Sequence, residues 1–381
     1  MPLPMFSAAL VAALVGFGST IALVLSAAAA LGATPDQMES WLLAVCLAKA
    51  AGSAVLSVTT RIPVVLAWST PGAALLAATS GITMAQAVGA FLLAGLLMVL
   101  TGLLKPLGRL IAAIPDGIAA AMLAGVLLPF CLKGALATQS LPHVVLPMLA
   151  VFAAVRLFNP ALAVLAALAL GITLALITGM ADMPRLTLPL PALVLIPPEF
   201  NAGVLLGLGV PIYLVTMASQ NLPGFTTLRA AGYTPPVRPA LIVTGAGSML
   251  SALFGGHMTN MAAITAALCL GDEVHPDRNQ RWKIGVVYGG FWLTLGLLGP
   301  AILPVLAALP PALMTALVGL ALLGPLMGAL TGAFTPVPTR FPATMTLAVA
   351  ASGTAFFGIG AAFWGLAAGL VLYALDQITK R

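Results

Sequence analysis

The stretch FGGHMTNMAAITAALCLGDE, residues 254–273, breaks the pattern of an otherwise apolar chain. Two glycines, a histidine and the pair Thr259 and Asn260 precede a run of about ten apolar residues, which stops at Gly271. A helix that crosses the hydrocarbon core of a bilayer needs about 20 apolar residues. The stretch therefore predicts a polar break in the backbone followed by half of a membrane helix.

The rest of the chain gives the environment of this break. Of its 381 residues, 61% are hydrophobic and 6% are charged, and the mean hydropathy is +1.14. Soluble globular proteins carry about 25% charged residues. Apolar segments recur along the chain, which predicts an all-α polytopic protein of the lipid bilayer without a separate soluble domain. The net charge of +6 is then expected to report membrane topology and not nucleic-acid binding.

Several classes of protein are excluded by what the sequence lacks. The N-terminal MPLPMFSAALVAALVGFG has no basic stretch before its apolar run, so it predicts a membrane helix and not a cleaved signal. The three cysteines lie in apolar segments at unrelated spacings, which predicts neither disulfides nor a metal site. Catalytic motifs and an ATP-binding loop are absent from the sequence. We therefore expect no cofactor, no metal and no enzyme.

Apolar runs between breaker residues predict 14 membrane segments. Twelve are long enough to span, at 5–31, 39–57, 83–104, 115–132, 143–157, 159–179, 201–220, 237–254, 281–299, 311–330, 341–357 and 361–378. Two more, at 69–80 and 259–270, are too short to span and are expected to be broken segments.

The basic residues favour counting both short segments as crossings. With the N- and C-termini in the cytoplasm, twelve basic residues fall on the cytoplasmic side: Arg61, Lys105, Arg109, Arg156, Arg229, Arg238, Arg278, Arg281, Lys283, Arg340, Lys380 and Arg381. Only Lys133 and Arg185 fall on the opposite side. This is the positive-inside bias expected in a bacterial-type cytoplasmic (inner) membrane, and omitting either short segment would invert every later loop.

The chain also repeats itself at an offset of 195 residues, where Ser53 aligns with Ser248 and Thr70 with Thr265. The stretch AAIPDGIAAAMLAGVLL, 112–128, aligns without gaps to AALPPALMTALVGLALL, 307–323. Each half holds seven segments, an odd number, so the two halves must be inverted in the membrane. Paired broken helices in inverted repeats mark the substrate site of secondary transporters at the bilayer midplane.

The two broken segments are expected to present helix N-termini to each other. In the first, 62–68 reads as extended, and Ser69 or Thr70 is expected to cap a helix with a proline in its first turn. In the second, Thr259 or Asn260 is the expected cap. Two N-termini together can bind an anion without a buried lysine. The alternative is that both breaks are ordinary kinks in spanning helices.

Further polar residues lie inside the predicted spans. Gln220 and Asn221 follow an apolar run, where an amide binds either a ligand or another helix. Lys49 lies in the middle of a span, where it can neutralise a bound carboxylate or extend toward the interface. His257 is the natural proton carrier by residue type, or it braces the turn. Asp116, at a helix start, is a third proton-coupling candidate or a cap.

Three motifs resemble those of a known family. ASQNLPG (218–224), FGGHMTNMAAITAA (254–267) and PVVLAWSTPGAALL (63–76) are similar to those of the BenE-type benzoate/proton symporters. The wider relatives of that family are the nucleobase permeases, the sulfate permeases and the anion exchangers. The resemblance covers essentially the whole chain. It implies 14 segments in a seven-plus-seven inverted repeat, with a short strand and a half-helix in segments 3 and 10.

The resemblance also implies a division of labour. Segments of a core domain, 1–104 and 196–299, would carry the substrate, and segments of a gate domain, 105–195 and 300–381, would support elevator-like transport and often a homodimer. The implied activity is import of benzoate or a similar aromatic carboxylate with protons. Nucleobase permeases have glutamates where this chain has Gln220 and Thr259, and a carboxylate there would repel an anion. The alternatives are a permease for another small anion or a nucleobase, and a channel.

The expected binding site follows from these two lines of argument. The carboxylate is expected near Ser69, Thr70, Thr259 and Asn260, with Gln220 and Asn221 completing the polar side, the ring against Trp68, Met261 and Phe17, and His257, Lys49 and Asp116 as proton-coupling candidates.

Overall fold

The computed structural model describes residues 3–104, 114–160, 162–182, 190–262, 264–272, 274–354, 356 and 360–379. Several sequence-based expectations lie outside these ranges: the domain boundary at 104–105, the start of the repeat at 112–128, and the basic residues Lys105, Arg109, Arg185, Lys380 and Arg381.

The first half of the chain contains eight described helices and one strand: α1 Leu3–Gly18, α2 Ile21–Ala30, α3 Pro35–Thr60, β1 Leu66–Trp68, α4 Thr70–Ala77, α5 Met84–Leu103, α7 Asp116–Ser140, α8 Pro142–Phe158 and α9 Ala163–Ile177. The second half begins with α10 Ala202–Val204, η1 Leu205–Gly209, α11 Val210–Thr216, η2 Met217–Asn221, α12 Leu222–Ala230, α13 Val237–Ala252, β2 Thr259–Met261 and α14 Ile264–Ala267. It ends with η3 Arg278–Gln280, α15 Lys283–Leu297, α16 Gly299–Ala307, α17 Pro311–Phe334, η4 Val337–Thr339, α18 Arg340–Ala351 and α19 Ala361–Thr379.

The structure confirms a polytopic helical membrane protein. Within the described ranges, seven helical stretches are long and apolar enough to cross a membrane. An eighth is added if α15 and α16, which are bent by 59° relative to each other, are taken as one span. The predicted segment 115–132 is too short, because α7 continues past the exposed Lys133 to Ser140. A long basic side chain that reaches toward the interface does not end a membrane helix.

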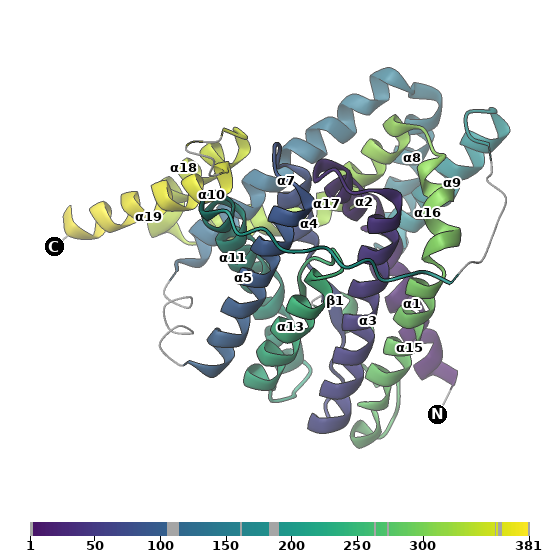
Figure 1. Ribbon diagram of the computed structural model, residues 1–381, viewed down its shortest axis with the longest axis horizontal. Coiled ribbons are helices and arrows are strands. Elements are labelled where there is room, and N and C mark those ends of the chain that lie inside the picture. Colours follow the sequence, from purple (N-terminus) through teal and green to yellow (C-terminus); the bar gives the residue numbers. More distant parts are fainter. Residues whose placement is uncertain are drawn as a thin grey trace.

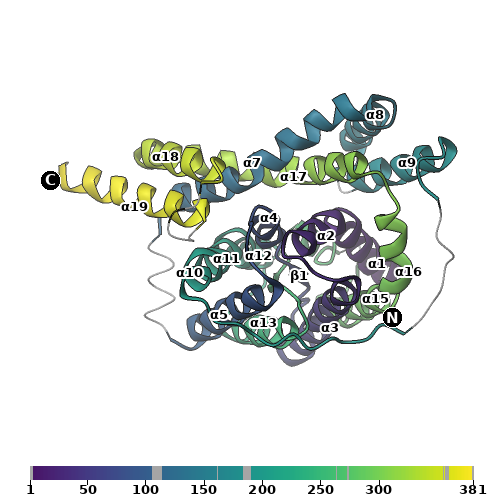
Figure 2. The ribbon, with the colours of Figure 1, turned by 45° about the horizontal axis from the view of Figure 1, so that its top comes forward.

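The helices lie in two layers (Figure 2). One, which we call the α7–α17 layer, contains α7, α8, α9, α17, α18 and α19. The other, the strand layer, contains α1 to α5, α10 to α13, α15 and both strands. Helices α7 and α17 cross closely, since a Cβ added to Gly134 would lie 2.7 Å from the Cα of Gly319. Side chains at that crossing would separate the two helices.

The two strands form the centre of the strand layer. They pair antiparallel, with Leu66 opposite Met261 and Trp68 opposite Thr259. Side chains from the surrounding helices satisfy the backbone groups of the strands: Ser53 Oγ accepts from the Leu66 N–H at 3.0 Å, and Ser248 Oγ accepts from the Thr259 N–H at 2.9 Å. Extended backbone is tolerated at membrane depth only when its polar groups are paired within the protein. The strands implied by the family resemblance are thus confirmed.

The first broken segment has the predicted form. Ser69 is the N-cap of α4, and its Oγ accepts from the Gly72 N–H at 3.1 Å, with Pro71 in the first turn. The second broken segment differs from the prediction. Thr259 and Asn260 are not helix caps; they are buried strand residues, which lie opposite Trp68 and Ala67 of β1.

The helix that carries Gln220 also differs from the prediction. It does not stop at this residue but continues through η2 into α12 and ends at Ala230. Both η1 and η2 are π-helical turns, and each is followed within two residues by a proline, Pro211 or Pro223. A proline cannot donate to the carbonyl four residues earlier, and its ring crowds that carbonyl. The wider turns relieve this conflict, so the helix bulges where the prediction placed a break.

An extended segment before α10 crosses the strand layer (Figure 1). The Val194 N–H donates to Ser40 Oγ at 2.8 Å, the Ile196 N–H to the Leu253 carbonyl at 2.8 Å, and the Glu199 N–H to the Ala85 carbonyl at 2.9 Å. These bonds attach the connection between the two halves of the chain to α3, α5 and the end of α13.

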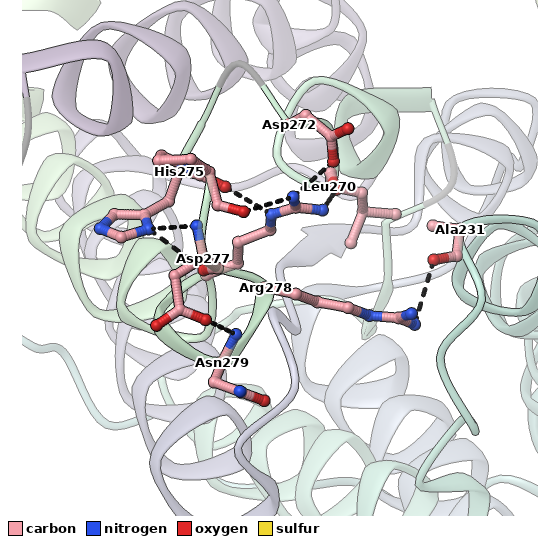
Figure 3. A network of polar contacts seen from close by, with 9 residues as sticks. Ala231, Leu270, Asp272, His275, Asp277, Arg278 and Asn279 are labelled. Carbon is pink, nitrogen blue, oxygen red and sulfur yellow. Dashed lines mark hydrogen bonds and ion pairs between the residues drawn. The ribbon is translucent and has the colours of Figure 1, made fainter.

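The polar loop 271–281 forms hydrogen bonds with the residues that follow α14 and α12 (Figure 3). The guanidinium of Arg281 donates to the Leu270 carbonyl at 3.3 Å and forms an ion pair with Asp272. Arg278 donates to the Ala231 carbonyl at 3.3 Å. Leu270 follows α14 and Ala231 follows α12, so the loop fixes the helix that carries Gln220 relative to the second broken segment.

Candidate functional site

A cavity of about 440 Å³ lies between the two layers. The strand layer contributes Val15, Gly16, Ser19, Thr20, Lys49, Ala67, Trp68, Thr70, Pro71, Gln220, Tyr288 and Trp292, joined by Thr265 of α14. The α7–α17 layer contributes Leu127, Phe152, Arg156, Asn159, Pro160, Val164, Leu320, Ala321, Gly324 and Pro325. The wall is mostly apolar with a few polar groups, which is typical of sites for small organic molecules.

Lys49 is the most unusual residue of this wall. Its side chain is fully buried, and within the described part of the chain its Nζ has no hydrogen-bond partner. Nζ lies 2.7 Å from the centre of the Trp292 ring and 4.2 Å from that of Trp68. Aromatic faces attract a cation, but a buried ammonium without an acceptor remains costly. An anion in the cavity would supply the missing acceptor.

Aromatic side chains surround this lysine. The rings of Trp68 and Trp292 are 5.1 Å apart at 71°, and Phe17 packs against both, at 5.8 and 6.1 Å. Trp68 is held in place because its Nε1–H donates to Thr20 Oγ1 at 2.6 Å. Such edge-to-face clusters present flat apolar surfaces that accept a further ring.

The N-terminus of α4 opens onto the same cavity through Thr70. Ser69 itself is fully buried, and its hydroxyl bonds that of Thr216 at 2.8 Å. Pro71 has no N–H, and the Gly72 N–H is taken by Ser69. The first turn can therefore offer a ligand the N–H and hydroxyl of Thr70, together with the positive end of the helix dipole.

The π-turn η2 brings Gln220 to the cavity wall. Its Oε1 accepts from Asn260 Nδ2 at 3.4 Å, so its Nε2 is the end of the amide left to donate to a ligand. Asn221 is fully buried behind it, and its Oδ1 accepts from the Met261 N–H at 2.9 Å. Asn221 thus holds the strand β2 in place, while Gln220 faces the cavity.

The predicted binding residues therefore form two groups. Four of the predicted residues line the cavity, namely Lys49, Trp68, Thr70 and Gln220. Six others are buried without lining it, namely Phe17, Ser69, Asn221, Thr259, Asn260 and Met261. Two atoms of this buried group, Thr259 Oγ1 and Asn260 Oδ1, have no hydrogen-bond partner in the described ranges.

His257 lies behind the strands and does not line the cavity. The Nε1–H of Trp41 donates to its Nδ1 at 2.9 Å. Nδ1 must then be unprotonated, because a second proton there would place two donors against each other. The geometry thus favours a bracing role for this histidine.

Asp116 does not line the cavity. It is exposed in the first turn of α7, and it borders a separate small cavity of about 20 Å³. An acidic residue at a helix N-terminus complements the helix dipole. This placement agrees with the capping alternative.

The charge of the cavity is positive. Of the described residues that line it, Lys49 and Arg156 are basic and none is acidic. The described ranges also bring together no group of three or more side chains that could hold a metal ion. The site is therefore suited to an organic anion that its polar and aromatic groups bind directly.

The sequence pattern does not point to several residues of this site. Thr20, Tyr288, Trp292 and Arg156 all line the cavity. The Ser19–Thr20 pair between two apolar runs marks the break between α1 and α2, and this signal was available. The two aromatic residues carry no such signal, because an aromatic side chain in a membrane helix can equally face lipid.

The sequence matches a described protein family. The model of the family BenE, benzoate membrane transport protein, matches residues 1–375. The inner membrane protein YdcO of Escherichia coli (strain K12) is 39% identical over 383 residues, covering 100% of this chain and 98% of that protein. A benzoate membrane transport protein of Acinetobacter baylyi is 32% identical over 367 residues, covering 96% and 93%.

Solved structures share the fold at low sequence identity. The transmembrane domain of the cyanobacterial bicarbonate transporter BicA has a TM-score of 0.58 and 15% identity, covering 99% of this chain and 98% of that chain. The murine anion transporter Slc26a9 has a TM-score of 0.63 and 12% identity, covering 100% and 69%. At such identities the likeness establishes the fold alone.

Proposed function

Because the chain belongs to the family of benzoate membrane transport proteins, we propose that it imports benzoate or a similar aromatic carboxylate through the cavity between its two layers. The family consists of membrane transport proteins, so the chain is a transporter and not an enzyme. Its apolar helices and its inner-membrane relative make it a multi-pass inner-membrane protein.

The observation that carries this proposal is the position of Lys49. Its ammonium group lies between two indole rings, and the described part of the chain gives it no acceptor and places no acidic residue at the cavity wall. Benzoate matches both features, because its carboxylate supplies the acceptor and its ring packs against aromatic faces. A neutral nucleobase would leave the buried charge unpaired.

The proposed pose uses the residues that line the cavity. The carboxylate accepts from Lys49, from Thr70 at the N-terminus of α4 and from Gln220 Nε2, and the ring lies against Trp68 and Trp292. Four buried residues support the site through hydrogen bonds that hold α4 and β2 in place: Ser69, Asn221, Thr259 and Asn260. Phe17 and Met261 support the aromatic wall and the strand pair.

We further propose 14 membrane segments in two inverted repeats of seven. Leu66 and Met261, which pair at the strand crossing, are separated by the same 195 residues at which the sequence repeats. The repeat partners Ser53 and Ser248 each accept a backbone N–H of one strand, from Leu66 and Thr259. At the same offset, α13 is the repeat partner of α3, and α15 is the repeat partner of α5. Helix α3 packs on α15, and α13 packs on α5, as an inverted repeat requires.

We propose a core domain, 1–104 and 196–299, and a gate domain, 105–195 and 300–381. The two layers support this division, because the helices named for the strand layer lie within the first set of ranges and those named for the α7–α17 layer lie within the second (Figure 2). The cavity lies between them. This supports an elevator mechanism in which the core moves the bound carboxylate past the gate. We propose a homodimer through the gate domain, with both termini in the cytoplasm as the basic residues favour.

Proton coupling belongs to the same proposal. Of the three candidate residues, Lys49 alone lines the cavity, whereas His257 bonds Trp41 and Asp116 is exposed on α7. In this mechanism Lys49 takes up a proton from outside before it binds the carboxylate, and it gives up both the carboxylate and the proton on the cytoplasmic side. The net charge carried through the membrane then stays at zero.

Competition for binding tests the substrate. In a thermal-shift assay of the purified protein, benzoate should raise the melting temperature, because a ligand that binds the native state stabilises it. Uracil and sulfate at the same concentration should not raise the melting temperature, and they should not reduce the shift that benzoate causes. Stabilisation by uracil or sulfate instead of benzoate would favour the alternative permeases and contradict the proposal.

A further inference from the structure

A second basic residue, Arg156, faces the cavity from the side opposite the strand layer. It lies in the last turn of α8, in the α7–α17 layer, and its side chain is half-buried. Across the described ranges it forms no ion pair and no hydrogen bond with its side chain. It is thus the second unpaired cation of a cavity wall that has no acidic residue.

A purely structural role would explain part of this arrangement. A basic residue in the last turn of a helix is favoured by the helix dipole, wherever its side chain points. This role does not require the side chain to border the cavity. It also does not require an arginine, whose planar guanidinium binds a carboxylate through two parallel hydrogen bonds.

We propose that Arg156 is a second carboxylate-binding residue, which receives the substrate anion from Lys49 on its way to the cytoplasm and, in the reverse direction, binds an anion that enters the cavity from the cytoplasm. The inference rests on the proposed function, which supplies the carboxylate. Arg156 belongs to the layer proposed as the gate and Lys49 to the layer proposed as the core. Movement of the core past the gate would therefore separate the two cations and let the anion pass from one to the other.

The location sets the direction of the effect. The distribution of basic residues assigns Arg156 to the cytoplasmic side. Its contribution should accordingly appear when benzoate binds from the cytoplasm and should be smaller from the opposite side. Because the side chain is only half-buried, its attraction for an anion should weaken as salt is added.

The test is the concentration dependence of benzoate transport in inside-out membrane vesicles. Arg156→Gln should raise the KM from the cytoplasmic side by roughly 10- to 100-fold, which corresponds to about 1.4–2.8 kcal/mol for the loss of a hydrogen bond between charged groups. The kcat should change little. Arg156→Lys, which keeps the charge without the planar fork, should recover part of the loss. Added salt should raise the wild-type KM more than that of Arg156→Gln.

Lys133→Gln is the matched control, because it removes one exposed positive charge from α7 outside the cavity, and its KM should equal that of the wild type. The inference is overturned if Arg156→Gln keeps the wild-type KM at low and high salt. It is also overturned if the glutamine and lysine variants lose kcat equally, which would indicate a structural role. A wild-type protein that transports no benzoate would instead overturn the proposed function itself.

Discussion

At the scale of single residues, the site combines an unpaired cation with aromatic walls. Among the residues that the structure describes, Lys49 has no acceptor and the lining of the cavity beside it includes no acidic side chain. Such a group lowers the stability of the empty protein, because its desolvation is only partly offset by the two indole rings. The presence of this lysine at the cavity wall is explained if the carboxylate of the substrate supplies the missing acceptor.

Replacing this lysine should therefore separate binding from stability. Lys49→Met should weaken benzoate binding by at least about 30-fold, since breaking a buried charge pair costs about 2–5 kcal/mol. The same change should leave the melting temperature of the ligand-free protein unchanged or raise it, because the uncompensated charge is gone. Titration calorimetry and thermal unfolding in detergent measure the two effects. The exposed Lys133→Met is the control, and wild-type affinity in Lys49→Met would contradict the proposed pose.

His257 gives a second prediction at this scale. His257→Asn keeps a hydrogen-bond acceptor close to the position of Nδ1, so it should retain benzoate uptake that a protonophore abolishes. His257→Leu leaves the buried N–H of Trp41 unpaired and should destabilise the protein by about 1–3 kcal/mol. Uptake by His257→Asn that no longer responds to the protonophore would show that this histidine carries the proton.

At the scale of elements, the two short strands set the position of the site. They place the start of α4 and the residues around Asn260 side by side although these lie far apart in the sequence. Their backbone groups are satisfied by serines on α3 and α13. The strand crossing is thus fixed by side chains from both halves of the chain.

The equivalence of these serines can be measured. Ser53→Ala and Ser248→Ala should each destabilise the protein by about 1–3 kcal/mol, because each leaves a buried strand N–H without an acceptor. If the halves are inverted repeats, the two losses should be similar in thermal unfolding. The half-buried Ser26, which bonds only a carbonyl within its own helix, is the matched control. A loss confined to one of the two strand-binding serines would argue against the equivalence.

The sequence could predict structural features that adjacent residues determine, but not those that depend on residues far apart in the chain. The α4 cap was predictable, because Ser69, Pro71 and the short apolar run that follows are adjacent. The strand around Asn260 was implied by the family resemblance alone, because a three-residue strand has no periodicity and its pairing partner lies almost two hundred residues away. An asparagine before an apolar run looks the same whether it caps a helix or pairs in a strand.

The bulge at Gln220 and the cavity wall were missed for related reasons. The apolar run predicts a helix that stops at Gln220, whereas the π-turn lets the helix continue past Pro223. Trp292 and Arg156 come from distant segments, and only packing determines that they face one cavity. In a membrane helix most faces are apolar, so composition does not reveal which face points inward.

At the scale of the whole molecule, the cavity between two layers suggests that one layer moves against the other. Gly18 of α1 lies against Leu165 of α9, where an added Cβ would be 3.5 Å from the Leu165 Cγ. This contact joins the strand layer to the α7–α17 layer. The pair is therefore well placed to report relative movement.

A disulfide between these positions should stop transport. The Gly18→Cys, Leu165→Cys double variant is made after Cys46, Cys131 and Cys269 are replaced by alanine, and its Cβ atoms should come close to the 3.5–4.5 Å typical of a disulfide. Oxidation should abolish benzoate uptake, and reduction should restore it, with each single cysteine variant as control. Full uptake by the cross-linked protein would contradict an elevator mechanism.

Counterflow in proteoliposomes that contain only this purified protein tests the central claim most directly. Vesicles are preloaded with unlabelled benzoate and diluted into a trace of radiolabelled benzoate. The proposed carrier predicts a transient, saturable accumulation of label above its outside concentration, absent from vesicles preloaded with uracil. Label that merely equilibrates, at a rate proportional to its concentration and regardless of the preload, would contradict the claim.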